Sequence, residues 1–160
     1  KRVYHGLMLQ TGELAARALV ASLLATPLLK IWPRGALPRW LRRHRRTFGL
    51  AAFGYAFLHA IFYAIWDGTG VFPDMLRVKY ILGYVALLIM VPLAWTSRDA
   101  AIKALGKRWR VLHRGAYLVA IAGAVHWMLM GSDTAVLIHF GPLALLQLNR
   151  LRVARQARAS

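Results

Sequence analysis

The sequence contains no cysteine and very few acidic residues. The absence of cysteine excludes disulfide frameworks, thiolate zinc sites, cysteine-ligated iron–sulfur clusters and cysteine nucleophiles. Only 5 Asp and Glu residues stand against 22 Lys and Arg residues, which gives a formal net charge of +17. The apolar stretches hold almost no buried acids, so the composition does not favour a proton pump.

The sequence is instead rich in long apolar segments. Hydrophobic residues make up 59% of the 160 residues and charged residues 17%, whereas ordinary soluble domains are about 45–50% apolar and about 25% charged. This balance excludes a soluble globule and a disordered chain. We therefore predict a single all-α domain over residues 1–160, an integral membrane helical bundle. Its five spans are Gly12–Leu29, Phe48–Trp66, Tyr80–Trp95, Gly115–Met130 and Thr134–Leu148.

The basic residues predict the orientation of this bundle. Of the 22, 17 lie in Lys30–Arg46, in Arg98–Arg114 and in the C-terminal tail, which five spans would place on one face. The positive-inside rule makes that face cytoplasmic. We expect a multi-pass protein of a bacterial inner membrane with its C-terminus in the cytoplasm. The charge then needs no nucleic acid partner, and contact with anionic membrane lipid accounts for part of it.

Three further expectations concern the ends and loops. The chain begins with Lys1 rather than Met, and a further span before Lys1 would make six spans with both ends cytoplasmic. Trp32-Pro33 and Leu37-Pro38 should break the helix after the first span. We expect one amphipathic helix over Ala100–Trp109 and a tight helical hairpin at Gly131–Asp133.

Two of the six histidines share one depth in the membrane. His59 and His126 each lie 11 residues from the cytoplasmic start of their span, which is about 16.5 Å at about 1.5 Å per residue. Both spans run in the same direction, so the two imidazoles could face each other across a flat cofactor, as the two axial ligands of a haem do. The alternative is that each histidine only satisfies itself on a neighbouring carbonyl group.

The other histidines carry weaker predictions. His139 also lies in the outer half of the membrane. It is either a substitute for one of the two haem ligands or a residue that forms a hydrogen bond between packed helices. His113 lies at the cytoplasmic edge, where it serves a second site or is an interfacial residue in a basic loop. We expect His44 to be solvated within its arginine run and His5 to lie on the terminal surface.

Several spaced motifs resemble one known family. They are Thr11-Gly12-Glu13 with Thr26-Pro27-Leu28, Arg45-Arg46 with Leu58-His59, Pro92-Leu93-Ala94 with Thr96-Ser97, and Trp109 with Leu112-His113-Arg114. The chain is similar over its whole length to the ferric-reductase-like transmembrane proteins. More closely, it resembles the haem-binding membrane subunit of the periplasmic methionine-sulfoxide reductase system (MsrQ-type).

This resemblance implies an electron-transfer function. It implies a b-type haem and a flavin such as FMN, with electrons taken from the quinone pool or a cytosolic flavin reductase. The acceptor would be a periplasmic molybdopterin methionine-sulfoxide reductase subunit that repairs oxidised proteins. His59 and His126 match the haem histidines, and His113 matches a third. Arg45 stands where larger ferric reductases carry a ligand of a second haem.

A second cofactor site is therefore expected on the cytoplasmic side. His113, Arg114, Arg45 and Arg46 gather there with Trp109. The arginines suit a flavin phosphate and the indole suits an isoalloxazine ring. The alternative is that these arginines only obey the positive-inside rule.

Three other functions stay open from the sequence. One is a stand-alone ferric or quinone reductase that needs no partner. Another, from a different class, is a histidine-lined metal or proton transporter, which would show no haem absorption. The last is a membrane scaffold with incidental histidines.

Overall fold

The computed structural model describes residues 1–159, except for the side chains of residues 72, 151, 153–155 and 157–159. Over this part of the chain every regular element is helical. The side chains of the basic tail residues Arg155 and Arg158 and the whole of Ser160 lie outside what is described. The elements are α1 (Arg2–Ile31), α2 (Ala36–Asp67), η1 (Gly68–Gly70), α3 (Val71–Asp74), α4 (Val78–Trp95), α5 (Asp99–Leu105), α6 (Lys107–Leu112), α7 (Gly115–Leu129) and α8 (Asp133–Ala159).

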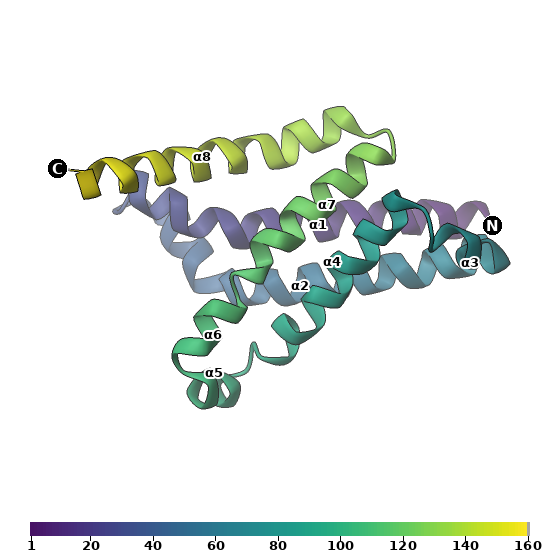
Figure 1. Ribbon diagram of the computed structural model, residues 1–160, viewed down its shortest axis with the longest axis horizontal. Helices are drawn as coiled ribbons and strands as arrows, with labels where there is room; N and C mark the ends of the chain where they lie inside the picture. Colours follow the sequence, from purple (N-terminus) through teal and green to yellow (C-terminus); the bar gives the residue numbers. More distant parts are fainter. Residues whose placement is uncertain (160) are drawn as a thin grey trace.

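Helices α1 and α2 form a long antiparallel hairpin (Figure 1). Only the stretch from Trp32 to Gly35 separates them, because α2 already begins at Ala36. The expectation that Leu37-Pro38 breaks the helix is therefore wrong. Pro38 lies in the first turn of α2, where its missing N–H has no helical acceptor to lose.

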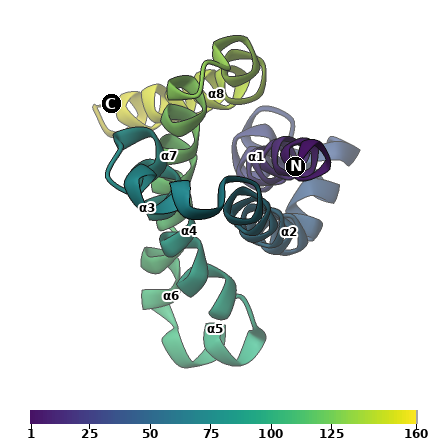
Figure 2. The ribbon, with the colours of Figure 1, turned by 90° about the vertical axis from the view of Figure 1, so that its right-hand side faces the viewer.

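A second antiparallel pair, α4 and α7, crosses the first, and α8 packs against α1 and α7 (Figures 1 and 2). The pairs meet in an apolar core that includes Leu23, Ala52 and Val119, all at most 2% exposed. Large apolar side chains cover the outside of the bundle, among them Leu88, Ile121 and Leu145. Such a surface suits hydrocarbon rather than water.

The connections differ in one place from their prediction. The stretch Ala100–Trp109 is not a single amphipathic helix, because α5 ends and α6 begins at Gly106. Gly106 has a φ of +50°, a backbone conformation that glycine adopts without the strain of a side chain. The tight hairpin at Gly131–Asp133 is confirmed, and there Gly131 takes a φ of +82° between α7 and α8.

Three helices of the described chain are long and apolar enough to cross a membrane: Arg2–Ile31, Ala36–Gly70 and Val78–Trp95. Helix α7 has 15 residues, about 22 Å at about 1.5 Å per residue, which is shorter than a hydrocarbon core of about 30 Å. The count of five spans stays a prediction. The N-terminus and α3 lie at one end of the bundle, and the α1–α2 turn lies at the other (Figure 1).

The orientation can be tested with reporter fusions. The 13 basic residues within Lys30–Arg46 and Arg98–Arg114 should hold those loops in the cytoplasm. An alkaline phosphatase fused within Gly68–Pro73 should be active, and the same enzyme fused after Ser160 should be inactive. The reverse pattern would overturn the orientation and the direction of electron flow together.

Candidate functional site: a two-histidine cavity

His59 of α2 and His126 of α7 face each other inside the bundle. Their ring centroids are 6.4 Å apart and their ring planes are nearly perpendicular, at 83°. The two residues are 67 positions apart in sequence, and the packing of α2 and α7 brings their rings together. The structure thus brings together the pair that equal depth on two spans had suggested.

Each ring is held through one nitrogen only. His59 Nδ1 lies 2.8 Å from the carbonyl oxygen of Met8 in α1, and His126 Nδ1 bonds the carbonyl oxygen of Lys79 in α4. A carbonyl oxygen only accepts, so both Nδ1 atoms carry the proton. The Nε2 atom of each ring therefore keeps its lone pair, which is the state in which imidazole binds a metal. The carbonyl contacts orient both rings without using up their ligand atoms.

The two histidines open into a cavity of about 390 Å³. Helices α1, α2, α4, α7 and α8 all contribute to its wall. Eight residues of that wall are glycine or alanine, which have little or no side chain. They are Gly12, Ala15, Ala16, Ala56, Ala60, Gly83, Ala86 and Gly123.

These features fit a haem. A metal–imidazole nitrogen bond is about 2 Å long and a ring centroid lies about 1.1 Å beyond its nitrogen, so two axial imidazoles have centroids about 6 Å apart. The observed separation is 6.4 Å. The apolar small-residue wall would take the macrocycle, and His59 and His126 would hold its iron.

The remaining outer histidines lie close by in other roles. His139 Nδ1 donates to the Ala135 carbonyl oxygen, so its Nε2 accepts from Arg17 Nε at 3.2 Å. Arg17 also pairs with Glu13. With both nitrogens engaged, His139 links α8 to α1 as a helix-packing hydrogen bonder. The same network neutralises the two charges inside the first span.

His5 is more than the terminal surface residue expected from its position. Its ring lies 5.1 Å from the ring of Trp66, and both line the two-histidine cavity. The expectation failed because α1 begins at Arg2, ten residues before the apolar segment, and runs along the end of α2. His44 is half-buried, with Nδ1 bonded to the Trp40 carbonyl oxygen, rather than simply solvated.

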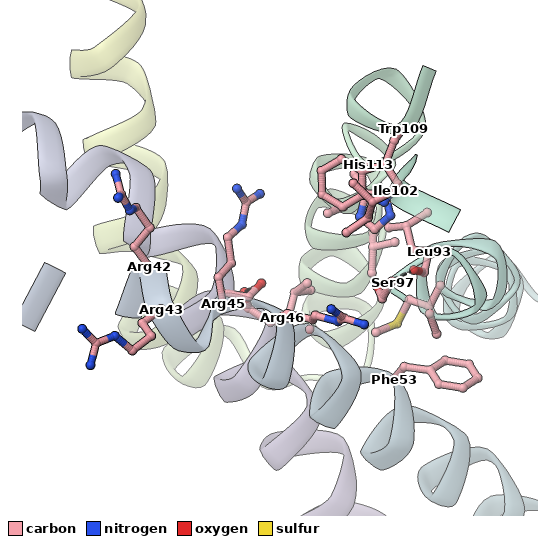
Figure 3. A pocket seen from close by; sticks show the side chains of 17 residues that line it. Arg42, Arg43, Arg45, Arg46, Phe53, Leu93, Ser97, Ile102, Trp109 and His113 are labelled. Atoms are coloured by element: carbon pink, nitrogen blue, oxygen red, sulfur yellow. Dashed lines mark hydrogen bonds between the residues drawn. The ribbon is translucent and has the colours of Figure 1, made fainter. Parts of the chain in front are cut away.

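A second cavity, of about 240 Å³, lies at the other end of the bundle. Its wall contains Arg45, Arg46, Trp109 and His113, four of the five residues expected to form a cytoplasmic site. Arg114 is exposed and does not line it. Figure 3 shows that Arg46 reaches across toward Ser97 and Leu93, while Arg42 and Arg43 point away. The structure therefore gathers most of the predicted inner cluster.

Thr96 ties the aromatic side of this second cavity together. The Trp109 indole N–H donates to the Thr96 carbonyl oxygen at 2.9 Å, and the Thr96 hydroxyl lies 3.1 Å from His113 Nε2. Trp109 and His113 stack with centroids 4.0 Å apart. Burial, and then the positive charge of Arg45, lower the pKa of His113 below its ordinary value. His113 is consequently neutral at pH 7, and the positive charge here belongs to the arginines.

The two cavities share three wall residues. Leu19 of α1, Met90 of α4 and Val119 of α7 line both and are buried in the core. A single layer of apolar side chains thus separates the inner cavity from the two-histidine cavity.

A tyrosine–carboxylate cluster lies beside the two-histidine cavity at the end of the bundle where α3 lies. Tyr63 and Tyr80 stack with centroids 5.3 Å apart and line the cavity. The Tyr63 hydroxyl donates to Asp74 Oδ2 at 2.8 Å, and Arg77 pairs with Asp74 at 3.0 Å. This cluster joins the ends of α2 and α4. No sequence pattern predicts this cluster, because its contacts depend on how α3 folds back.

The cluster predicts a pH-dependent contribution to stability. Burial by itself raises the pKa of Asp74, but hydrogen bonds from Tyr63 and Tyr80 and the charges of Arg77 and Lys79 hold it below the ordinary value. The stabilisation is therefore present above the unfolded pKa of about 3.9 and is lost as pH falls through the lower folded pKa. We expect Asp74→Asn to lower Tm at pH 7 and to lower it less below about pH 4. An equal loss of Tm at both pH values would contradict this assignment.

The fold and site define a class. A bundle of apolar helices that presents two histidines to one small-residue cavity is suited to hold haem inside a membrane and to transfer electrons. Residues 11–124 match the family model described as the ferric reductase like transmembrane component, so the chain belongs to this family. No solved structure matches the chain.

Curated relatives narrow the family further. The chain is 41% identical over 127 residues to the haem-binding subunit MsrQ of protein-methionine-sulfoxide reductase from Azospira oryzae, covering 74% of this chain and 52% of that protein. It is 39% identical over 159 residues to the subunit of the same name from Rhodospirillum rubrum, covering 93% and 74%. The Rhizobium meliloti subunit is 40% identical, covering 72% and 54%. The chain spans about half the length of two of these three relatives.

Proposed function

We propose that this protein is the membrane electron-transfer subunit of a methionine-sulfoxide reductase system. The observation that carries the proposal is the pairing of His59 with His126. Their ring centroids lie 6.4 Å apart, and each Nδ1 is bonded to a backbone carbonyl oxygen. The names of the similar subunits support it. A b-type haem bound between these residues supplies an iron that takes up and releases one electron at a time.

The protein's own residues do the rest. Met8 and Lys79 fix both rings through their carbonyl oxygens, which keeps each Nε2 available to the iron. Most of the cavity wall is apolar, and Leu19, Met90 and Val119 bring the inner cavity within one side-chain layer of it.

The donor and the acceptor are part of this proposal. Electrons would enter on the cytoplasmic side from the quinone pool or a cytosolic flavin reductase. They would leave on the periplasmic side to a molybdopterin subunit that reduces methionine sulfoxide. FMN would occupy the inner cavity, with Arg45 and Arg46 on its phosphate and the Trp109–His113 stack beside its ring.

A reoxidation experiment tests this function. The haem of the purified, reduced protein should reoxidise rapidly only when the periplasmic reductase and methionine sulfoxide are both present. Measurement of the haem absorption over time would follow the reaction. Equally rapid reoxidation by ferric citrate alone would favour a stand-alone ferric reductase instead.

A further inference from the structure

Each of the two facing histidines brings the Nδ1–Cε1 side of its ring against a glycine of the neighbouring helix. A Cβ atom added to Gly12 of α1 would stand 2.8 Å from Nδ1 of His59 and 3.1 Å from its Cε1. A Cβ atom added to Gly83 of α4 would stand 3.1 Å from Cε1 of His126 and 3.2 Å from its Nδ1. At Gly12 an added Cβ would force the His59 ring to shift, and at Gly83 the His126 ring would have to move by a few tenths of an ångström.

The glycine and the carbonyl that holds each ring have the same spacing. His59 bonds the carbonyl oxygen of Met8, four residues before Gly12. His126 bonds the carbonyl oxygen of Lys79, four residues before Gly83. In an α-helix the Cβ of a residue tilts toward the N-terminus and covers the preceding turn. A missing Cβ therefore uncovers the carbonyl oxygen four residues earlier, which can then accept a second hydrogen bond.

We call this arrangement of histidine ring, glycine and carbonyl oxygen a histidine seat, and it occurs once on each side of the cavity. In the first, α1 provides the glycine and carbonyl, and its antiparallel partner α2 provides the histidine. In the second, α4 provides the glycine and carbonyl, and its antiparallel partner α7 provides the histidine. Two separate helix pairs thus hold an imidazole in the same way, with Nδ1 protonated. Chance packing of a glycine would not produce this repetition of ring, glycine and carbonyl.

We propose that Gly12 and Gly83 are positioning residues that seat His59 and His126 as axial ligands of an iron porphyrin. The proposal rests on the proposed haem-binding function for the identity of the ligand. The seats themselves are features of the polypeptide and can be tested without haem. Thr11-Gly12-Glu13, one of the motifs behind the family resemblance, thereby gains a physical role for its glycine.

Substitution by alanine separates the seat from a general effect on the helix. Replacing glycine by alanine at an exposed position inside a helix normally stabilises the helix. A loss of haem affinity on substitution must therefore come from the contact between the added Cβ and the histidine ring. We expect Gly12→Ala to weaken haem binding by about 10- to 100-fold, the range for losing a group that orients a metal ligand. Gly83→Ala should weaken it less, since its added Cβ is less crowded. Haem titration and the electron paramagnetic resonance spectrum of the oxidised protein would measure both.

Gly54→Ala is the matched control. Gly54 lies in α2, five residues before His59, and a Cβ there meets nothing within 4 Å. It lines neither of the two cavities. This variant should keep wild-type haem affinity and an unchanged spectrum. Wild-type haem affinity in Gly12→Ala would overturn the proposal.

If the variants bind no haem at all, a double-mutant cycle in haem-free protein tests whether Gly12 positions His59. Gly12→Ala should lower the Tm of haem-free protein that contains His59 and should raise it, or leave it unchanged, in the His59→Ala background. The same change of Tm in both backgrounds would refute the seat. Failure of the wild-type protein to bind haem would refute the proposed function instead, so the two failures are distinguishable.

Discussion

His59→Ala and His126→Ala are each expected to remove essentially all bound haem. A single imidazole from one helix cannot hold the iron from both faces of the ring, so loss of either ligand leaves the other unable to compensate. Each substitution also opens a hole in the wall of an apolar cavity. The loss should show as the disappearance of the Soret band at constant protein concentration, measured after purification in detergent.

His44→Ala is the control for this prediction. His44 lies in the same helix as His59 but lines neither cavity, so its spectrum should match the wild type. His5→Ala is not a neutral control, because His5 lines the two-histidine cavity. A normal low-spin spectrum in His59→Ala would disprove the pairing, and His139→Ala would then be the next variant to examine.

The second large effect is expected at the inner cavity. Arg45→Ala should slow haem reduction by a cytosolic flavin reductase about ten-fold or more, since a hydrogen bond to a charged group contributes about 1.5–3 kcal/mol. His113→Ala should slow it as well, since it removes the ring that stacks on Trp109. Neither residue touches the two-histidine cavity, so the haem spectrum should stay intact. Stopped-flow absorption of the haem after addition of reductase and nicotinamide cofactor would measure the rate. Arg39→Ala, an exposed arginine in the same helix that lines neither cavity, is the matched control.

Cofactor counting completes this prediction. We expect one haem and one FMN per chain in protein purified with its inner cavity intact. Two haems per chain and no flavin would contradict the assignment of the inner cavity. His113 would then be the first candidate for an inner ligand, in spite of Arg45 at the position where larger ferric reductases carry its partner.

The pairing of His59 with His126 could be predicted from the sequence because helical rise is nearly constant. Two residues the same number of positions from the cytoplasmic start of parallel spans lie at similar depth when the two spans have a similar tilt. The inner cluster was predictable for a related reason, since charges and aromatic residues at span ends meet at the same membrane face. Arg114 shows the limit of this argument, because depth says nothing of which side of a helix a residue occupies.

The seats and the outer cluster could not be predicted in this way. The contact of His59 with Gly12 depends on the rotation of α1 against α2, and the hydrogen bond from Tyr63 to Asp74 depends on how α3 folds back. A one-dimensional pattern records neither. The helix break at Gly106 could have been predicted from the sequence, since a glycine between two short basic stretches is a common helix end.

The most direct test of the central claim is the spectrum of the oxidised wild-type protein with its haem quantified. Optical and electron paramagnetic resonance spectra of purified protein should show a six-coordinate, low-spin haem with two imidazole ligands, at one per chain. The nearly perpendicular rings, at 83°, should give a strongly anisotropic signal. A five-coordinate, high-spin haem, or protein that purifies without Soret absorption and takes up no added haem, would contradict the account.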